Sequence, residues 1–208
     1  MARWSVTAKR RGTAVLVGRH VTLRVLTNHD FEAWRTVRRR SADWLTPWEP
    51  IVPSGQLDPT EDRGAVAARC AARMREIELG TGYGFGLFHE DGFAGEVNLS
   101  NIRRGPAQTA LLGYWVDRQC AGRGLVPEGV VLALRFAFED LALHRVEAGV
   151  LPRNAASLRV MEKLDLPCEG ITRGMLEING AWEDHQRFAL LSEDWVGRRE
   201  ELLSTWVW

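Results

Sequence analysis

The sequence lacks an excess of charge of either sign, and it lacks a long apolar run. Its 208 residues carry 27 Lys and Arg against 27 Asp and Glu, so the formal net charge is +0. A general nucleic-acid-binding protein needs a basic surface, so we expect no direct nucleic-acid partner. No apolar run approaches the roughly 20 residues of a membrane-spanning helix, and no apolar segment follows the basic residues near the N-terminus. We therefore expect no membrane partner.

Cysteine is also scarce. Cys70, Cys120 and Cys168 are widely spaced, odd in number and without any CxxC pairing. This usage fits a reducing compartment, so we expect a cytoplasmic protein without a disulfide framework. The five histidines show no ligand spacing, and we expect no metal site.

What is present is the composition and the hydrophobic pattern of one α/β domain, with 45% hydrophobic and 26% charged residues. Strands are predicted at residues 20–26, 83–89, 93–100, 109–116, 145–151, 171–178 and 186–191. Helices are predicted at 31–40, 60–79, 125–141, 154–164 and in a tail containing Trp195 and Leu202. Prolines 47, 50, 53 and 59 predict that residues 44–59 form an ordered aromatic loop without a regular element.

A glycine-containing segment, Gln119-Cys120-Ala121-Gly122-Arg123-Gly124, lies between a predicted strand and a predicted helix. Glycine lets the backbone approach an anion, and the free N–H groups at a helix start bind phosphate. A bare GxG before a helix also occurs as a simple tight turn. The segment alone therefore leaves both interpretations open.

This Q-x-x-G-x-G pattern after a strand resembles the pyrophosphate-binding motif of the GNAT acetyltransferase superfamily. Further segments look like its RimJ/RimL branch, whose known members acetylate the N-terminal α-amine, such as that of an alanine, of ribosomal proteins. These segments are Trp48–Pro50, Leu112–Val116, Phe136–Phe138, Leu143–Ala148, Asn154–Ser157, Glu169–Gly170 and Asn179–His185. Where the branch usually reads Lys-Leu-Gly-Phe, this chain has Lys163-Leu164-Asp165-Leu166. Asp enters the left-handed conformation less readily than Gly, which predicts a different turn there.

The resemblance implies a GNAT fold in a single N-acetyltransferase domain, residues 1–208 with a core at about 20–195. In that fold helices flank a mixed, mostly antiparallel central sheet, and its two central strands splay apart to hold acetyl-CoA, the cosubstrate. No metal is implied. The implied cofactor-binding residues are Trp115, Val116, Gln119, Gly122, Arg123, Gly124, Leu125, Asn154 and Ser157.

Two residues are candidates for the catalytic proton transfers. Ser157 matches the serine proposed in RimL-like enzymes to protonate the leaving thiolate, although Ser157 and an N-cap Asn154 could also simply satisfy local backbone groups. Glu96 shares one strand face with Asn98 and Ser100. It could relay a proton through water if that face lines the cleft, and a solvated strand face is the alternative.

The acceptor is less determined than the donor. Candidate acceptor-binding residues are Trp48, Glu49, Asn98, Tyr114, Asp184 and His185; for the tryptophans, core packing is the alternative. An α-amine with a pKa near ~8 is about a tenth neutral near neutral pH, so it needs little help from a base. We expect acetylation of a protein N-terminus, with a ribosomal protein as the first candidate. A small-molecule amine acetyltransferase, for an antibiotic or a polyamine, and a non-catalytic acyl-CoA-binding module remain alternatives.

Overall fold

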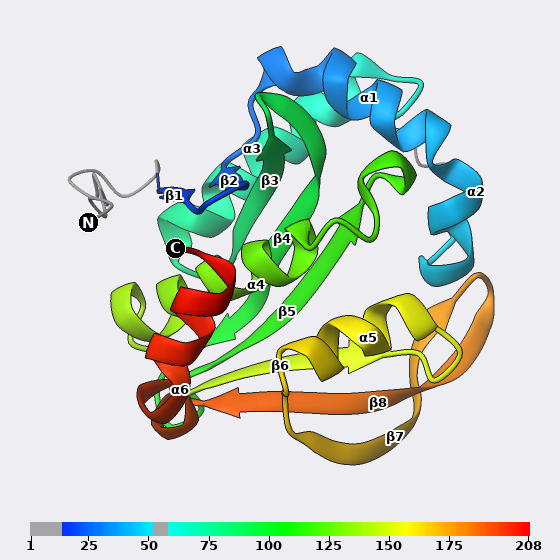
Figure 1. Ribbon diagram of the computed structural model, residues 1–208. Coiled ribbons are helices and arrows are strands. Elements are labelled where there is room, and N and C mark those ends of the chain that lie inside the picture. The colour runs from blue at the N-terminus through cyan, green and yellow to red at the C-terminus, as the bar shows by residue number, and fades with distance from the viewer. Residues whose placement is uncertain (1–13, 52–57) are drawn as a thin grey trace.

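The computed structural model describes residues 14–51 and 58–208, which form one eight-stranded sheet with helices on both faces (Figure 1). The strand order is β1-β2-β3-β4-β5-β6-β8-β7. Neighbouring strands are antiparallel except β5 and β6, which are parallel. This mixed, mostly antiparallel sheet confirms the predicted fold class. Within the described ranges, none of the helices combines the length and the apolarity that a membrane span requires.

The element bounds are as follows. The strands are β1 (Val15–Val17), β2 (Thr22–Arg24), β3 (Tyr83–His89), β4 (Gly92–Arg103), β5 (Thr109–Val116), β6 (Arg145–Val150), β7 (Cys168–Ile178) and β8 (Ala181–Leu191). The α-helices are α1 (Phe31–Arg40), α2 (Ala42–Leu45), α3 (Arg63–Leu79), α4 (Leu125–Arg135), α5 (Ala155–Lys163) and α6 (Ser192–Trp206). Short 3₁₀ turns are η1 (Asn28–Asp30), η2 (Thr46–Trp48) and η3 (Arg118–Cys120), and a π-helical turn, η4 (Phe136–Asp140), continues α4.

Two buried clusters join the helices to the sheet. On one face, Val97 and Leu99 of β4 belong to the large core that also contains Val130 and Leu134 of α4. On the other face, a smaller cluster gathers Phe31, Trp34 and Val37 of α1 with Val66 of α3 and with Phe88 and Phe93 of the sheet. Because side chains alternate along a strand, Glu96 and Asn98 face α1 and α3 while Val97 and Leu99 face α4.

The parallel pair β5 and β6 separates partway along its length. Among the described residues, β5 pairs with β6 only at Thr109–Leu111, opposite Arg145–Glu147, although β5 continues to Val116. On its other side β5 stays paired with β4, and a Cβ added at Gly95 would lie 2.2 Å from the Trp115 carbonyl oxygen. Glycine is thus required at position 95 for this close approach. The sheet therefore has a gap between the C-terminal half of β5 and β6, while β5 remains joined to β4.

The structure matches the sequence-based bounds of α1, β3 and β5 and corrects others. The short strand β1 was not predicted, α3 begins at Arg63 rather than Thr60, and β7 and β8 begin earlier than expected. The prediction that residues 44–59 contain no regular element is wrong for its first part, which holds the end of α2 and the turn η2. Pro47 lies in the first turn of η2, where the missing N–H costs nothing. Residues 52–57 lie outside the described ranges.

The expected change of turn at Asp165 does not occur. Asp165 adopts the left-handed conformation, with φ of 46°. The Asp165 N–H donates to the Glu162 carbonyl oxygen at 3.0 Å, and the Leu166 N–H donates to the Met161 carbonyl oxygen at 3.0 Å. Asp therefore closes the end of α5 in the conformation for which Gly is usually selected.

Candidate active site

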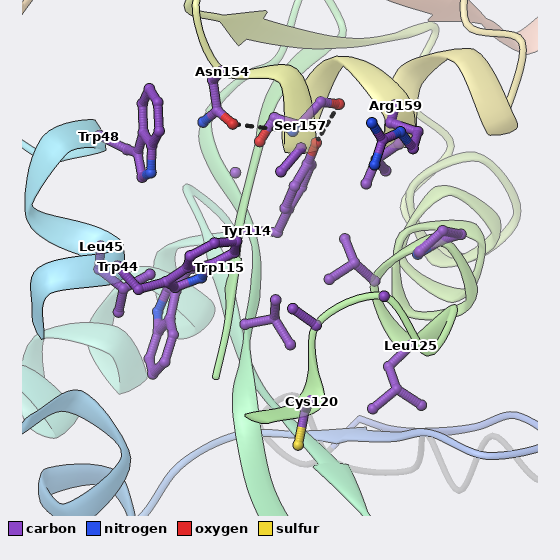
Figure 2. Close-up of a pocket in the computed structure, with 18 of the residues that line it drawn as sticks. Trp44, Leu45, Trp48, Tyr114, Trp115, Cys120, Leu125, Asn154, Ser157 and Arg159 are labelled. Carbon is purple, nitrogen blue, oxygen red and sulfur yellow. Dashed lines mark hydrogen bonds between the residues drawn. The ribbon is translucent and has the colours of Figure 1, made fainter. Parts of the chain in front are cut away.

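A cavity of about 370 Å³ opens where β5 and β6 separate. Its lining comes from the end of β5, the loop after it, the first turns of α4 and α5, and the segment from α2 to η2 (Figure 2). In Figure 2, Trp44, Leu45 and Trp48 lie on one side of β5, and Leu125 and Arg159 lie on the other. The cavity thus crosses the gap in the sheet, and a different set of side chains lines it on each side of β5.

The glycine loop, residues 119–124, forms one side of this cavity. Gly122 and Gly124 both line it and both have positive φ, 80° and 83°. A Cβ at Gly122 would meet no atom within 4 Å, so the space beside this backbone is open. Gly124 is the N-cap of α4, and the first N–H groups of a helix have no intrahelical acceptor. Together with the helix dipole, these groups form a site suited to a phosphate.

The start of α5 forms the roof of the cavity, as Figure 2 shows. Asn154 is the N-cap, and its Oδ1 accepts the Ser157 N–H at 3.1 Å. Ser157 itself lines the cavity. Tyr114 lies beneath, and its hydroxyl donates to the Ser157 carbonyl oxygen at 3.3 Å. Burial raises the pKa of Tyr114 to about 12, so the phenol stays neutral.

A tryptophan wall, made of Trp44, Leu45, Trp48 and Glu49, forms the side opposite the glycine loop. Glu49 is the acidic residue among those lining the cavity. Arg38 of α1 holds both of its carboxylate oxygens, at 2.7 Å each. Burial alone would lower the pKa of Arg38, but the hydrogen bonds to Glu49 raise it, so this guanidinium stays charged. The wall therefore offers aromatic surface beside a fixed carboxylate.

Contacts from the opposite half of the sheet hold the tryptophan wall in place. Arg153, in the turn before α5, donates to the Pro47 carbonyl oxygen at 3.1 Å and to Glu183 of β8 at 2.6 Å. Its guanidinium carbon lies 5.0 Å from the centre of the Trp48 ring. The Asn179 N–H, at the β7–β8 turn, donates to the Glu49 carbonyl oxygen at 3.0 Å. The wall thus bridges the two halves of the separated sheet.

Glu96 occupies a different place from the residues that line the cavity. It is 2% exposed, so the alternative of a solvated strand face does not apply. One carboxylate oxygen accepts the Trp34 indole N–H at 2.8 Å, and the other accepts from Arg69 at 2.6 Å. Its neighbour on the same face, Asn98, does line the cavity. A proton-relay function of Glu96 stays a prediction, and it would require a water to reach this buried carboxylate.

Most of the residues predicted from the sequence line one cavity. These are Trp48, Glu49, Asn98, Tyr114, Trp115, Val116, Gly122, Gly124, Leu125, Asn154 and Ser157. Gln119 and Arg123 belong to the glycine loop but lie outside the lining. Asp184 and His185 also lie outside it: Asp184 accepts the Gly174 N–H at 2.8 Å, and His185 is 3% exposed.

Sequence reasoning did not select Leu45, Arg159, Lys163 or Arg38. Arg159 and Lys163 lie one helical turn apart on α5 and line the cavity beyond Ser157. Their helical spacing from residues 155–156 is the signal that could have identified them. Arg38 has no comparable signal, because its partner Glu49 follows it by 11 residues through two further turns of helix. Among the described residues, no three His, Cys, Asp or Glu side chains gather as a metal site would need.

Comparison with known sequences gives the family. The model of the acetyltransferase (GNAT) domain matches residues 20–166. The probable N-acetyltransferase YjcK of Bacillus subtilis is 44% identical over 128 residues, which cover 61% of this chain and 71% of that protein. The [ribosomal protein uS5]-alanine N-acetyltransferase of Escherichia coli is 31% identical over 175 residues, covering 82% of this chain and 88% of that protein.

Solved structures agree with the sequence relatives. Mycobacterium smegmatis RimJ in complex with CoA-disulfide superposes with a TM-score of 0.82 at 27% identity and covers 93% of both chains. The ribosomal-protein-S5-alanine acetyltransferase of Vibrio fischeri gives a TM-score of 0.78 at 27% identity, covering 88% of this chain and 98% of that one. The chain therefore belongs to the GNAT acetyltransferase family, with relatives of the RimJ/RimL type.

Proposed function

We propose that this protein transfers the acetyl group of acetyl-CoA to the N-terminal α-amine of a protein. The observation that carries the proposal is the cavity at the sheet gap, which has the glycine loop on one side and the tryptophan wall on the other. The donor would place its pyrophosphate at Gly122 and Gly124 and its pantetheine along Trp115 and Val116. Its thioester would then face the wall, where an amine can approach.

The chemistry needs few groups from the protein. The amine nitrogen attacks the thioester carbonyl carbon, and the oxyanion that forms is stabilised by a backbone N–H of β5 near Val116. Collapse breaks the carbon–sulfur bond and leaves the acetyl group on nitrogen. The thiolate takes a proton from the Ser157 hydroxyl, and the surplus proton of the attacking amine passes to water. Ser157 then recovers a proton from solvent.

The acceptor side supports an α-amine over a strongly basic amine. Glu96 is paired with Trp34 and Arg69 and lies outside the cavity lining, so it does not face the acceptor as a ready base. An α-amine is about a tenth neutral near neutral pH, whereas a lysine amine is below roughly 0.1% neutral. The Glu49 carboxylate is paired with Arg38, but its oxygens can each accept a further hydrogen bond, so it can hold the ammonium form at the tryptophan wall before a proton is lost. Relatives that act on uS5 alanine support a protein N-terminus, with a ribosomal protein as the first acceptor to test.

The experiment is a substrate panel with acetyl-CoA, read by mass spectrometry of the acceptors and by release of free CoA thiol. The panel contains peptides copied from ribosomal-protein N-termini, aminoglycosides and polyamines. We expect peptides to gain one acetyl group and the small amines to remain unchanged. Modification of small amines alone would assign the protein to the antibiotic or polyamine class, and binding without CoA release would make it a non-catalytic acyl-CoA-binding module.

A further inference from the structure

A buried polar cluster lies behind the cavity, between α1 and the glycine loop. Its centre is Asp117, the residue that follows β5, whose side chain is 0% exposed. Its carboxylate accepts the Ser41 hydroxyl at 2.8 Å, the Arg40 Nε–H at 3.2 Å and the Gln119 N–H at 3.3 Å. Arg40 forms a second contact through its terminal nitrogen.

The charge of this cluster is balanced inside the protein. Burial would raise the pKa of Asp117, but hydrogen bonds from Arg40, Ser41 and the Gln119 amide lower it below its usual value. The same ion pair raises the pKa of Arg40. Each donor to this buried carboxylate is held in place, because a carboxylate oxygen that loses a donor is left partly unsatisfied without water to replace it.

Ser41 connects this cluster to both sides of the cavity. Its hydroxyl donates to Asp117 and accepts the Arg118 N–H at 3.2 Å, so it holds the first residues of the loop after β5. Its carbonyl oxygen accepts the N–H groups of Trp44 at 3.1 Å and Leu45 at 3.0 Å. Ser41 is itself the junction between α1 and α2, and it is 0% exposed. Ser41 is therefore hydrogen-bonded both to the loop after β5 and to the base of the tryptophan wall.

We propose that Asp117 and Ser41 are positioning residues that couple the glycine loop to the tryptophan wall, so that donor and acceptor each strengthen the binding of the other. This inference rests on the proposed function, because it assigns the loop to acetyl-CoA and the wall to the acceptor. Neither residue touches the reacting atoms. Donor bound at the loop holds residues 117–120 in one arrangement, and this arrangement fixes Ser41 and the α2 turn that carries Trp44 and Leu45. Because binding coupling is reciprocal, the acceptor must improve donor affinity by the same factor.

The test is titration calorimetry with an N-terminal peptide that the enzyme acetylates, in the absence and presence of saturating CoA, which binds without turnover. In the wild type we expect CoA to tighten peptide binding by at least about fivefold, the lower end of ordinary binding coupling. In Ser41→Ala we expect the coupling factor, by which CoA tightens peptide binding, to fall toward one. The affinity for CoA in the absence of peptide should change less than about twofold. Arg40→Lys, which keeps the charge, should retain more of the factor than Arg40→Gln does.

A matched control and a stability measurement separate coupling from simple damage. Thr46→Ala removes a hydroxyl from the same segment, where it donates to the Ala42 carbonyl oxygen at 2.8 Å away from the loop, and it should keep the wild-type factor. Thermal unfolding of each variant checks that the fold persists. An unchanged factor in folded Ser41→Ala, or a wild-type factor of one, would overturn the coupling proposal. A wild type that acetylates no peptide would instead overturn the proposed function.

Discussion

The Tyr114 hydroxyl donates to the Ser157 carbonyl oxygen at 3.3 Å and so joins β5 to the first turn of α5 across the gap in the sheet. On the same turn, the Asn154 side chain accepts the Ser157 N–H. Ser157 is thus held through its backbone at two points, which leaves its hydroxyl directed to the cavity (Figure 2). This arrangement is what a proton donor to a leaving thiolate requires.

Ser157→Ala is the first test of that assignment. We expect kcat to fall by about 100-fold or more, the ordinary contribution of a general acid, while KM for acetyl-CoA changes little. Ser157→Cys keeps a proton donor at the position and should recover part of the loss. Steady-state kinetics with varied acetyl-CoA measures both. Equal losses in kcat and in donor affinity would make Ser157 a binding residue only.

Tyr114→Phe tests the bond across the sheet gap. It leaves the Ser157 carbonyl oxygen without its donor and should lower the free energy of unfolding by about 1 kcal/mol. The difference in the free energy of unfolding between wild type and variant depends on pH. The folded pKa of about 12 lies above the value of about 10 for an unperturbed tyrosine, so the native state holds the phenolic proton more tightly. The stabilisation that comes from the neutral Tyr114 phenol is therefore complete below pH ~10 and is lost as the pH rises toward ~12.

Urea unfolding of wild type and Tyr114→Phe at several alkaline pH values measures this dependence. The wild type should lose stability relative to the variant as the pH rises through the folded pKa. A stability difference that stays constant over this range would contradict the buried, neutral phenol.

Gly122→Trp tests the donor site. The open space beside Gly122 would be filled by the indole, and we expect acetyl-CoA binding to be lost in calorimetry. The positive φ of 80° also strains any larger residue, so Gly122→Asn is the matched control, since Asn tolerates this conformation. The Asn variant should bind acetyl-CoA with only a modest loss. Full affinity in the Trp variant would place the pyrophosphate elsewhere.

Arg153→Gln tests the contacts by which Arg153 holds the tryptophan wall. The change removes the hydrogen bond to the Pro47 carbonyl oxygen, the pairing with Glu183 and the contact with the Trp48 ring. Partly exposed contacts of this kind contribute about 0.5–1 kcal/mol each, so loss of all three should raise acceptor KM by about tenfold or more with donor KM unchanged. Arg199→Gln, an exposed arginine on α6 paired with Glu200, is the control. An equal acceptor KM in the two variants would show that the Arg153 contacts do not shape the acceptor site.

Glu128→Ala tests the hydrogen bonds that join α4 to the segment before β2. Glu128 is 3% exposed, and one carboxylate oxygen accepts the N–H groups of His20 at 2.7 Å and Val21 at 3.0 Å. Loss of this acceptor leaves two N–H groups near the core unsatisfied and should lower the free energy of unfolding by about 2–4 kcal/mol. Glu128→Gln keeps an acceptor oxygen and should cost less. Chemical denaturation compares them, and equal losses would contradict this account.

The sequence predicts most of what depends on local pattern. Turn residues between apolar segments locate β3 and β5, N-cap residues precede α1, and the Q-x-x-G-x-G pattern locates the glycine loop. It does not predict contacts between distant segments. Ser41 and Asp117 are 76 residues apart, and Arg69 and Glu96 belong to different elements, so no local pattern pairs them. The helical turns at residues 42–48 are hidden for another reason, since proline there reads as a breaker but occupies a first turn.

The measurement that tests the central claim most directly uses two peptides of one ribosomal-protein N-terminal sequence, incubated with the protein and acetyl-CoA. One peptide has a free α-amine and acetylated lysines; the other has a blocked α-amine and free lysines. The account predicts that mass spectrometry finds one added acetyl group on the first peptide, located at its N-terminal residue, and none on the second. Acetylation of the second peptide, or of neither while small amines are modified, would contradict it.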